Sequence, residues 1–263
     1  MDLGLAGKVA LVAAASKGLG RAIAEELARE GASIVMCARG EDALRAARDE
    51  IAGSTGADVI AVAGDVSRSE DVDNIVRHAL EEFGRVDILI TNAGGPPSGK
   101  FESLSQEMWQ NAVDLTLMSV INLTAAVMPG MKERKWGRII NVTSIAVKQP
   151  VAGLMLSNSL RAAVTGFART LANEVAPFGV TVNNILPGYT RTERVEQLSR
   201  AVAKREGVTQ NAAVERWESE IPMGRLGEPR EFAALAAFIA SERASYITAQ
   251  SIVVDGGWIR GLL

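Results

Sequence analysis

Short apolar runs alternate with longer segments of helical periodicity along almost the whole chain of 263 residues. The runs are rich in valine, isoleucine and alanine, which is typical of strands buried on both faces. Because such alternation favours a parallel sheet covered by helices on both faces, the pattern predicts an α/β fold. We expect about seven strands, at residues 9–13, 33–38, 59–63, 86–90, 138–142, 181–186 and 251–254.

The segments between these runs are expected to be helical. After a first helix near residue 23, they are 41–53, 69–83, 104–135, 151–176, 193–220 and 229–240. Ser69 is expected to cap the amino terminus of its helix, since a serine hydroxyl can accept from a free N–H group there. In such folds ligands bind beyond the carboxyl ends of the strands, so the chemistry is expected in the loops that follow them.

Length, composition and charge narrow the function classes. With 263 residues, 48% of them hydrophobic, the chain can bury one large core and is expected to form a single domain over residues 1–263. A net charge of −3 gives no electrostatic reason to expect nucleic acid or an anionic membrane as a partner. No amino-terminal signal and no run of about 18 apolar residues without polar breaks is evident, so a cytoplasmic location is expected.

The chain has one cysteine, Cys37, and one histidine, His78. Together they cannot make an internal disulfide or a thiolate–imidazole metal cluster. No metal site is therefore predicted. Cys37 is expected to be a small buried hydrophobic residue, and His78 an ordinary residue on a helix face.

A turn of small residues follows the first apolar run. From Ala14 to Gly20 the sequence reads AASKGLG, and helical spacing begins directly after it. Glycines let a ligand approach the backbone, and the N–H groups and dipole of a helix amino terminus favour a pyrophosphate. The turn therefore predicts a dinucleotide site. The alternative is that the small residues serve only close packing of the strand and the helix.

The order of several landmarks resembles the short-chain dehydrogenase/reductase family over almost the whole chain. The landmarks are ASKGLG at 15–20, GDV at 64–66, NAG at 92–94, GRIINVTS at 137–144, PG at 187–188 and YITAQSIVVDGG at 246–257. The first is similar to the family's T-G-x-x-x-G-x-G turn, with Ala13 and Ala14 in place of Thr and Gly. The resemblance implies a single-domain, Rossmann-type doubly wound sheet with a small helical lid at approximately 188–222.

The resemblance also implies which residues hold a dinucleotide. The turn would bind the pyrophosphate, the GDV segment the adenine, the NAG segment the adenosine ribose, and the segment after the sixth strand the nicotinamide, with its last threonine on the carboxamide. Each polar member also has an interpretation as ordinary turn chemistry. The residues assigned in this way are Ser16, Lys17, Gly18, Leu19, Gly20, Asp65, Val66, Asn92, Ala93, Gly94, Pro187, Gly188, Thr190 and Thr192.

Two basic residues favour NADP(H) over NAD(H). A carboxylate directly after the second strand favours a ribose 2′-hydroxyl, whereas a basic group there accommodates a 2′-phosphate. This chain has Ala38 and Arg39 at that position, and Lys17 in the turn faces the same site. The alternative is that Arg39 and Lys17 are solvated surface charges.

The catalytic positions depart from the family pattern, which implies an Asn, a Ser, a Tyr and a Lys, the last two spaced Y-x-x-x-K. Ser144 fits the serine, but Thr116, Ser157 and Arg161 stand at the Asn, Tyr and Lys positions. Arg161 can bind ribose hydroxyls or a phosphate, and its charge can stabilise an oxyanion. The hydroxyl of Ser157 is a far poorer acid than a phenol, whose pKa is about 10.

Three other proton sources are open: Tyr189, Lys148, or a water held by Ser144, Ser157 and Arg161. Basic residues in the lid could suit an acidic carrier, but glutamates are interleaved with them, so a solvated helix face is expected. These basic residues are Arg191, Arg194, Arg200, Lys204 and Arg205.

Three hypotheses follow. The first is an NADP(H)-dependent carbonyl/alcohol oxidoreductase, similar to 3-oxoacyl-carrier-protein reductases, that acts on a small-molecule or acyl-thioester carbonyl through a remodelled proton path. The second is a dinucleotide-binding protein with little or no catalysis. The third is an NAD-dependent sugar or polyol dehydrogenase. In each case the long helices near 104–135 and 151–176 suggest subunit packing, as a dimer or a homotetramer.

Overall fold

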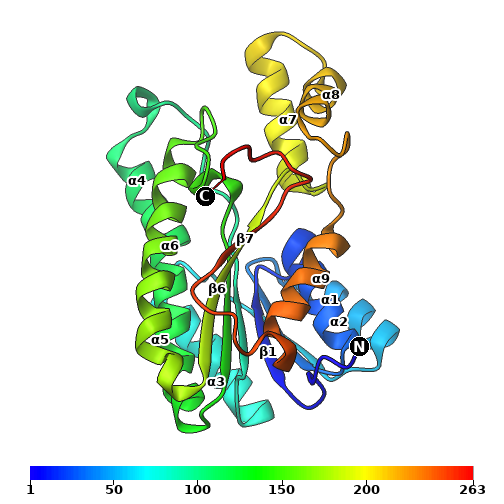
Figure 1. The fold of residues 1–263 in the computed structure, drawn as a ribbon, viewed down its shortest axis with the longest axis vertical. Coiled ribbons are helices and arrows are strands. Elements are labelled where there is room, and N and C mark those ends of the chain that lie inside the picture. Colours follow the sequence, from blue (N-terminus) through cyan, green and yellow to red (C-terminus); the bar gives the residue numbers. More distant parts are fainter. Residues whose placement is uncertain (263) are drawn as a thin grey trace.

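The structure is a computed structural model that describes residues 1–262. Seven parallel strands form one sheet in the order β3-β2-β1-β4-β5-β6-β7 (Figure 1), which confirms the predicted doubly wound α/β fold. The predicted strand bounds hold to within two residues. The strands are β1 Val9–Ala13, β2 Ser33–Ala38, β3 Val59–Ala63, β4 Ile88–Thr91, β5 Gly137–Val142, β6 Val180–Pro187 and β7 Ser251–Val254.

Helices cover both faces of the sheet (Figure 1). Successive strand residues point to opposite faces, so β1 supplies Ala10 and Val12 to one hydrophobic core and Leu11 and Ala13 to the other. The first core lies under α1 Gly18–Arg29, α2 Glu41–Thr55 and α9 Pro229–Ala240; the second lies under α3 Ser69–Phe83, α5 Ser119–Glu133 and α6 Met155–Val175.

The predicted N-cap at Ser69 is wrong. Ser69 is the first helical residue of α3, and Arg68, at the N-cap position, makes no side-chain capping bond. Glu70 and Asp71 instead place negative charge in the first turn, where the helix dipole favours it. Asp71 also accepts a hydrogen bond from the backbone N–H of Asp65 at 2.8 Å.

The segment 104–135 is not the single helix that its periodicity predicts. A 3₁₀ turn, Phe101–Ser103, precedes α4 Gln106–Val113, and a π-helical turn, Asp114–Met118, joins α4 to α5. Because a π turn is wider than an α turn, it rotates the apolar face between the two helices. As a result α4 packs on α6, while α5 packs on α3, β4 and β5.

By length and composition the continuous stretch Gln106–Glu133 could cross a membrane, which was not expected from the sequence. The core helix of a soluble protein passes the same test. Here α5 contacts two central strands and α3, as a core helix does. The apolar character of this stretch is therefore explained in part by its packing on the sheet.

The predicted helix 193–220 is divided into α7 Glu193–Glu206 and α8 Gln210–Glu220. Gly207 separates them with a left-handed φ of 68°, which glycine adopts without strain. Val195, Trp217 and Ile221 form a small core between the two helices. This helical lid lies beyond the carboxyl ends of the strands, at the top of Figure 1.

A row of polar side chains crosses the sheet from the last residue of β4 to the first residue of β7. Thr91 Oγ1 donates to Asn141 Oδ1 at 2.7 Å, and Asn141 Nδ2 donates to Asn184 Oδ1 at 3.0 Å. Asn184 Nδ2 then donates to Ser251 Oγ at 3.1 Å. We call these four residues the polar row. It joins β4, β5, β6 and β7 through side-chain hydrogen bonds.

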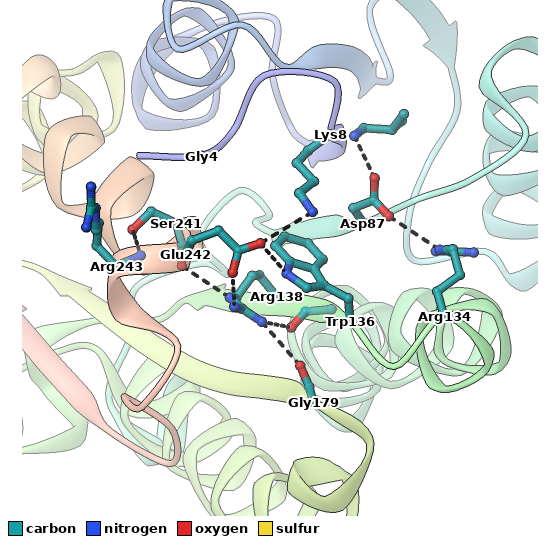
Figure 2. A network of polar contacts seen from close by, with 12 residues as sticks. Gly4, Lys8, Asp87, Arg134, Trp136, Arg138, Gly179, Ser241, Glu242 and Arg243 are labelled. Carbon is teal, nitrogen blue, oxygen red and sulfur yellow. Dashed lines mark hydrogen bonds and ion pairs between the residues drawn. The ribbon is translucent and has the colours of Figure 1, made fainter. Parts of the chain in front are cut away.

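A second polar network lies at the opposite, amino-terminal edge of the sheet (Figure 2). Arg138, 2% exposed, donates to the carbonyl oxygens of Gly179 and Ser241 at 3.3 and 3.4 Å and pairs with Glu242 at 3.7 Å. Asp87, fully buried, accepts from the Val9 backbone N–H at 3.0 Å. These contacts connect β1, β5 and the end of α9 on the side away from the lid.

Candidate active site

The turn between β1 and α1 has the geometry of an anion site. Lys17 occupies the N-cap of α1 with extended backbone, and the first turn has neither a side-chain cap nor an acidic residue. The N–H groups that open the helix can therefore bind a pyrophosphate. Gly18 has a φ of 59°, a conformation that favours glycine, whereas a Cβ on Gly20 would lie 2.4 Å from the Ala14 carbonyl oxygen. Gly20 therefore lets α1 pack closely on the Ala14 backbone, whereas the free N–H groups at the start of α1 and the conformation of Gly18 fit an anionic ligand.

The two basic residues assigned to the 2′-phosphate each have an acidic partner. Lys17 pairs with Glu193 at the start of α7 and lowers the pKa of that carboxyl. Arg39 lies 3.9 Å from Asp65, and its side chain is 72% exposed. The Lys17–Glu193 pair connects the turn to the lid, while Arg39 keeps most of its surface open to a ligand.

The loops after β3 and β4 hold the residues assigned to the adenosine. Asp65 accepts from the backbone N–H and the hydroxyl of Ser67 at 3.0 and 2.8 Å, so its carboxylate shapes the turn. Val66 packs in the core beneath. Asn92, Ala93 and Gly94 follow β4, and a Cβ built on Gly94 would meet no atom within 4 Å. This side of the loop therefore has room for a ligand.

The segment after β6 is held close to two other loops. A Cβ on Gly188 would lie 2.6 Å from the Cα of Asp255, so glycine lets this segment pass the loop after β7. Thr190 is buried, and Thr192, the N-cap residue of α7, donates to the Thr190 carbonyl at 3.2 Å. A Cβ on Gly18 would lie 3.7 Å from Thr192 Cγ2. The fold thus places Thr192 beside the anion turn.

Two of the assigned catalytic residues, Ser144 and Arg161, lie together at the end of β5. Ser144 follows β5, and Ser157 and Arg161 lie one turn apart on α6. Arg161 Nη1 donates to the carbonyl oxygens of Val142 and Thr143, each at 2.8 Å. The guanidinium is therefore held next to Ser144. Ser157 is buried on the same helix.

Arg194 is the one lid arginine whose surroundings differ from the prediction of a solvated face. Its Nη2 donates to the Pro96 carbonyl at 3.0 Å, and a Cβ on Gly95 would lie 2.6 Å from the same nitrogen. Burial lowers the pKa of Arg194. Burial and then the charge of Arg194 lower the pKa of Arg161 to about 10, so Arg161 remains a cation at neutral pH.

Thr116 lies in the π-helical turn, which packs against α6. Its Oγ1 is buried without a hydrogen-bond partner among the described residues, and the same holds for Oγ1 of Thr143. Unpaired buried hydroxyls are rare, and π turns are frequent at functional sites. Thr116 was predicted from the sequence, whereas Thr143 was not, although its position directly before Ser144 was an available signal.

The two tyrosines are directed elsewhere. Tyr189 stacks on Trp217 with ring centroids 4.7 Å apart and meets the edge of Trp258 at 5.8 Å, inside the lid. Burial, with a smaller contribution from Glu220, raises the pKa of Tyr189 to about 12. Tyr246 is fully exposed. A phenol of raised pKa packed between two indoles is a poor proton donor.

Lys148 lies closer to the altered catalytic residues. It ends the 3₁₀ turn Ile145–Val147, for which Ser144 is the N-cap residue.

Ser144 Oγ accepts from the Ala146 backbone N–H at 3.1 Å. The backbone thus fixes the serine oxygen at the mouth of the site and leaves its hydroxyl proton free to donate.

Comparisons with known proteins agree with this geometry. A family model described as enoyl-(acyl carrier protein) reductase matches residues 13–259. The chain is 38% identical to 3-oxoacyl-(acyl-carrier-protein) reductase FabG of Vibrio cholerae over 255 residues, which cover 97% of this chain and 98% of the relative.

Two solved structures are similar over nearly the whole chain. L-sorbose reductase from Gluconobacter frateurii, complexed with NADPH and L-sorbose, matches with a TM-score of 0.95 at 36% identity and covers 100% of both chains. YwfH, an NADPH-dependent reductase involved in bacilysin biosynthesis, matches with a TM-score of 0.92 at 34% identity, covering 97% of this chain and 99% of the other.

Proposed function

The chain belongs to the short-chain dehydrogenase/reductase family, and on this premise we propose that it is a cytoplasmic, NADP(H)-dependent oxidoreductase with a remodelled proton path. It interconverts a carbonyl and an alcohol on a small molecule or an acyl thioester. One observation carries the proposal: the Arg161 guanidinium lies 2.8 Å from the two carbonyl oxygens at the end of β5, beside Ser144.

Residues at the carboxyl edge of the sheet would hold the cofactor. The uncapped N–H groups from Gly18 to Gly20 would hold the pyrophosphate, and Thr192, beside Gly18, would hold the nicotinamide carboxamide. Arg39 and Lys17 select the 2′-phosphate, and no acidic residue follows β2 directly to repel it. Support comes also from the similar structures whose titles name NADPH.

The residues of the chain supply orientation and charge. When bound, NADPH supplies a hydride to the carbonyl carbon. Ser144 donates a hydrogen bond to the carbonyl oxygen, because the backbone already satisfies its oxygen from the other side. The fixed charge of Arg161 stabilises the alkoxide that develops there.

Proton delivery differs from the family pattern. Neither the hydroxyl of Ser157 nor a guanidinium gives up a proton as readily as a phenol, and Tyr189 is packed inside the lid. We assign the proton to a water bound by Ser144, Ser157 and Arg161. Since loss of a general acid typically costs about 10²–10⁴-fold, turnover is expected to be slow.

The proposal is tested by binding and then by catalysis. NADPH is titrated by fluorescence, and its oxidation is followed at micromolar enzyme with a ketone panel that includes an acetoacetyl thioester. Arg161→Met and Ser144→Ala should each lower kcat/KM by about 10²-fold or more. Arg169→Met, on the exposed side of α6, is the matched control and should leave kcat/KM within about twofold.

A double variant separates a specialised site from a degraded one. If Ser157 and Arg161 form a working arrangement, Ser157→Tyr combined with Arg161→Lys should be slower than the parent chain. A faster double variant would mean that the native pair is only a damaged version of the family pair. Tight NADPH binding with no oxidation on any substrate would favour the second hypothesis, a dinucleotide-binding protein without catalysis.

A second substrate class is polyhydroxy ketones. The likeness to a reductase crystallised with NADPH and L-sorbose, over the full length of both chains, favours it. L-Sorbose therefore belongs in the same assay panel. Higher kcat/KM for L-sorbose than for the thioester would select this class.

We further propose that the protein is a homo-oligomer, a dimer or tetramer, that assembles through α4, α5 and α6. In the stretch Gln106–Glu133, only 44% of the most apolar 18-residue window is buried within the chain. Association through this surface would remove the remaining apolar side chains from water.

A further inference from the structure

A lysine of the anion turn is paired with a carboxylate of the lid. Lys17 Nζ donates a hydrogen bond to Glu193 Oε2, and Glu193 is the first residue of α7. The backbones on both sides of this contact are also close, since a Cβ on Gly18 would lie 3.7 Å from Thr192 Cγ2. The amino-terminal end of α7 therefore lies beside the amino-terminal end of α1.

The same lysine is one of the two basic residues assigned to the 2′-phosphate. The Ala15 backbone N–H donates to the Cys37 carbonyl oxygen at 3.0 Å, which holds the anion turn against the end of β2. Arg39 follows two residues after Cys37. Lys17 and Arg39 thus come from adjoining loops, and a phosphate bound there would find one of its two cations already paired with Glu193.

The carboxylate of Glu193 has support that does not depend on Lys17. Gln197 Nε2, one turn further along α7, donates to Glu193 Oε1 at 3.1 Å. Glu193 also lies in the first turn of α7, where the helix dipole favours a negative charge. The hydrogen bond and the charge of Lys17 lower the pKa of Glu193, so its carboxyl is ionised at neutral pH. Glu193 is therefore a fixed anion to which Lys17 can bind and from which it can depart.

Lys17 can exchange this partner for another anion. Its ammonium group is carried on a flexible four-carbon stem, and 66% of its side chain is exposed. Ion pairs between exposed side chains are weak, so a doubly charged phosphate can compete for the lysine. Arg39 is less committed, since its Nη1 lies 3.9 Å from Asp65 and the Asp65 carboxylate already accepts from Ser67.

We propose that Glu193 competes with the 2′-phosphate of the cofactor for Lys17, which makes Glu193 a specificity-determining residue. It lowers the preference for NADPH over NADH and leaves Arg39 as the main ligand of the phosphate. This inference rests on the proposed NADP(H)-dependent function and adds a residue of the lid to the choice of cofactor. If the pair were instead a clasp that closes the lid over either cofactor, it would not distinguish the two.

The test is a fluorescence titration that gives Kd for NADPH and for NADH. Glu193→Gln removes the charge but keeps an oxygen that can accept from Gln197. We expect it to lower Kd for NADPH about three- to fivefold, the strength of an exposed ion pair, and to leave Kd for NADH within about twofold. Glu196→Gln is the matched control, because this glutamate of the same helix pairs with Arg200 at 3.4 Å, and both Kd values should stay within about twofold.

The gain in affinity should depend on the lysine. In a Lys17→Met chain, adding Glu193→Gln should change Kd for NADPH by less than about twofold, because no lysine is left to release. Isothermal titration with 2′,5′-ADP and with 5′-AMP isolates the phosphate, since neither fragment carries a nicotinamide. Glu193→Gln should tighten the binding of 2′,5′-ADP and leave that of 5′-AMP unchanged.

The outcomes separate this inference from the proposed function. Equal changes for NADPH and NADH in Glu193→Gln would overturn it in favour of a lid clasp. A gain that persists in the Lys17→Met chain would also overturn it, because Glu193 would then only repel the phosphate. Normal NADPH oxidation with an unchanged cofactor preference would contradict this inference alone. A Lys17-dependent gain without NADPH oxidation on any ketone would support the competition and count against the oxidoreductase function.

Discussion

At the scale of single residues, Ala14 is strained where the family turn has glycine. Its φ is 51°, in the left-handed region that costs a residue with a Cβ about 1–2 kcal/mol. Glycine loses about 0.5–1 kcal/mol more backbone entropy on folding, so Ala14→Gly should raise the free energy of unfolding by up to about 1 kcal/mol, measured by urea denaturation. Ala13→Gly, in the extended and buried part of β1, is the matched control and should lower it. A destabilised Ala14→Gly would show that the methyl group contributes packing that outweighs the strain.

At the scale of elements, the polar row connects four strands through side chains alone. Asn141 is its centre, since it accepts from Thr91 and donates to Asn184. Asn141→Leu keeps the number and branching of side-chain heavy atoms but leaves one buried donor and one buried acceptor unpaired, each costing about 1–3 kcal/mol, so unfolding free energy should fall by about 2–4 kcal/mol. Thermal and urea unfolding measure this. Adding Thr91→Val should recover part of the loss, because it removes the unpaired donor; strict additivity of the two changes would argue against the row as a unit.

At the scale of the whole molecule, the two edges of the sheet carry different groups of residues. The lid and the candidate site lie at the carboxyl edge, and Arg138 and its hydrogen-bond partners lie at the amino-terminal edge (Figure 2). Arg138→Met should lower unfolding free energy by about 2–4 kcal/mol, because the carbonyl oxygens of Gly179 and Ser241 lose their donor. NADPH affinity should stay within about twofold. Urea unfolding measures the change in stability and fluorescence titration measures the NADPH affinity, with the exposed Arg45→Met as control. Parallel losses of stability and affinity would show that the edges are coupled.

The strands were predictable because each one is a short apolar run between turn residues. In a sheet covered on both faces, such a run is the main signal that the sequence carries for a strand. The helix bounds were harder. Ser69 was expected to cap α3, but acidic side chains one and two residues later serve the helix dipole instead. The π-helical turn Asp114–Met118 has no local signature, since its apolar spacing is compatible with a continuous helix.

Part of the candidate site could be proposed from the family resemblance. Ser144, Ser157 and Arg161 were assigned in this way; the structure places Ser144 and the Arg161 guanidinium at the end of β5 and Ser157 one turn before Arg161 on α6, and their catalytic roles stay a prediction. Arg194 was assigned to a solvated face because glutamates surround it in the sequence. In three dimensions Glu196 and Glu206 pair with other lid arginines, Glu193 pairs with Lys17, and Arg194 turns inward to Pro96.

The sequence by itself determined the layered fold and the order of loops at one edge of the sheet, because hydrophobic periodicity specifies strands and helices, and parallel strands bring their carboxyl ends together. Only the tertiary structure decided which side chains meet which loops there. Arg194 and Pro96 are 98 positions apart in the chain, and the hydrogen bond between them depends on how the lid returns over the loop after β4. That contact is set by packing between elements, which no local pattern records.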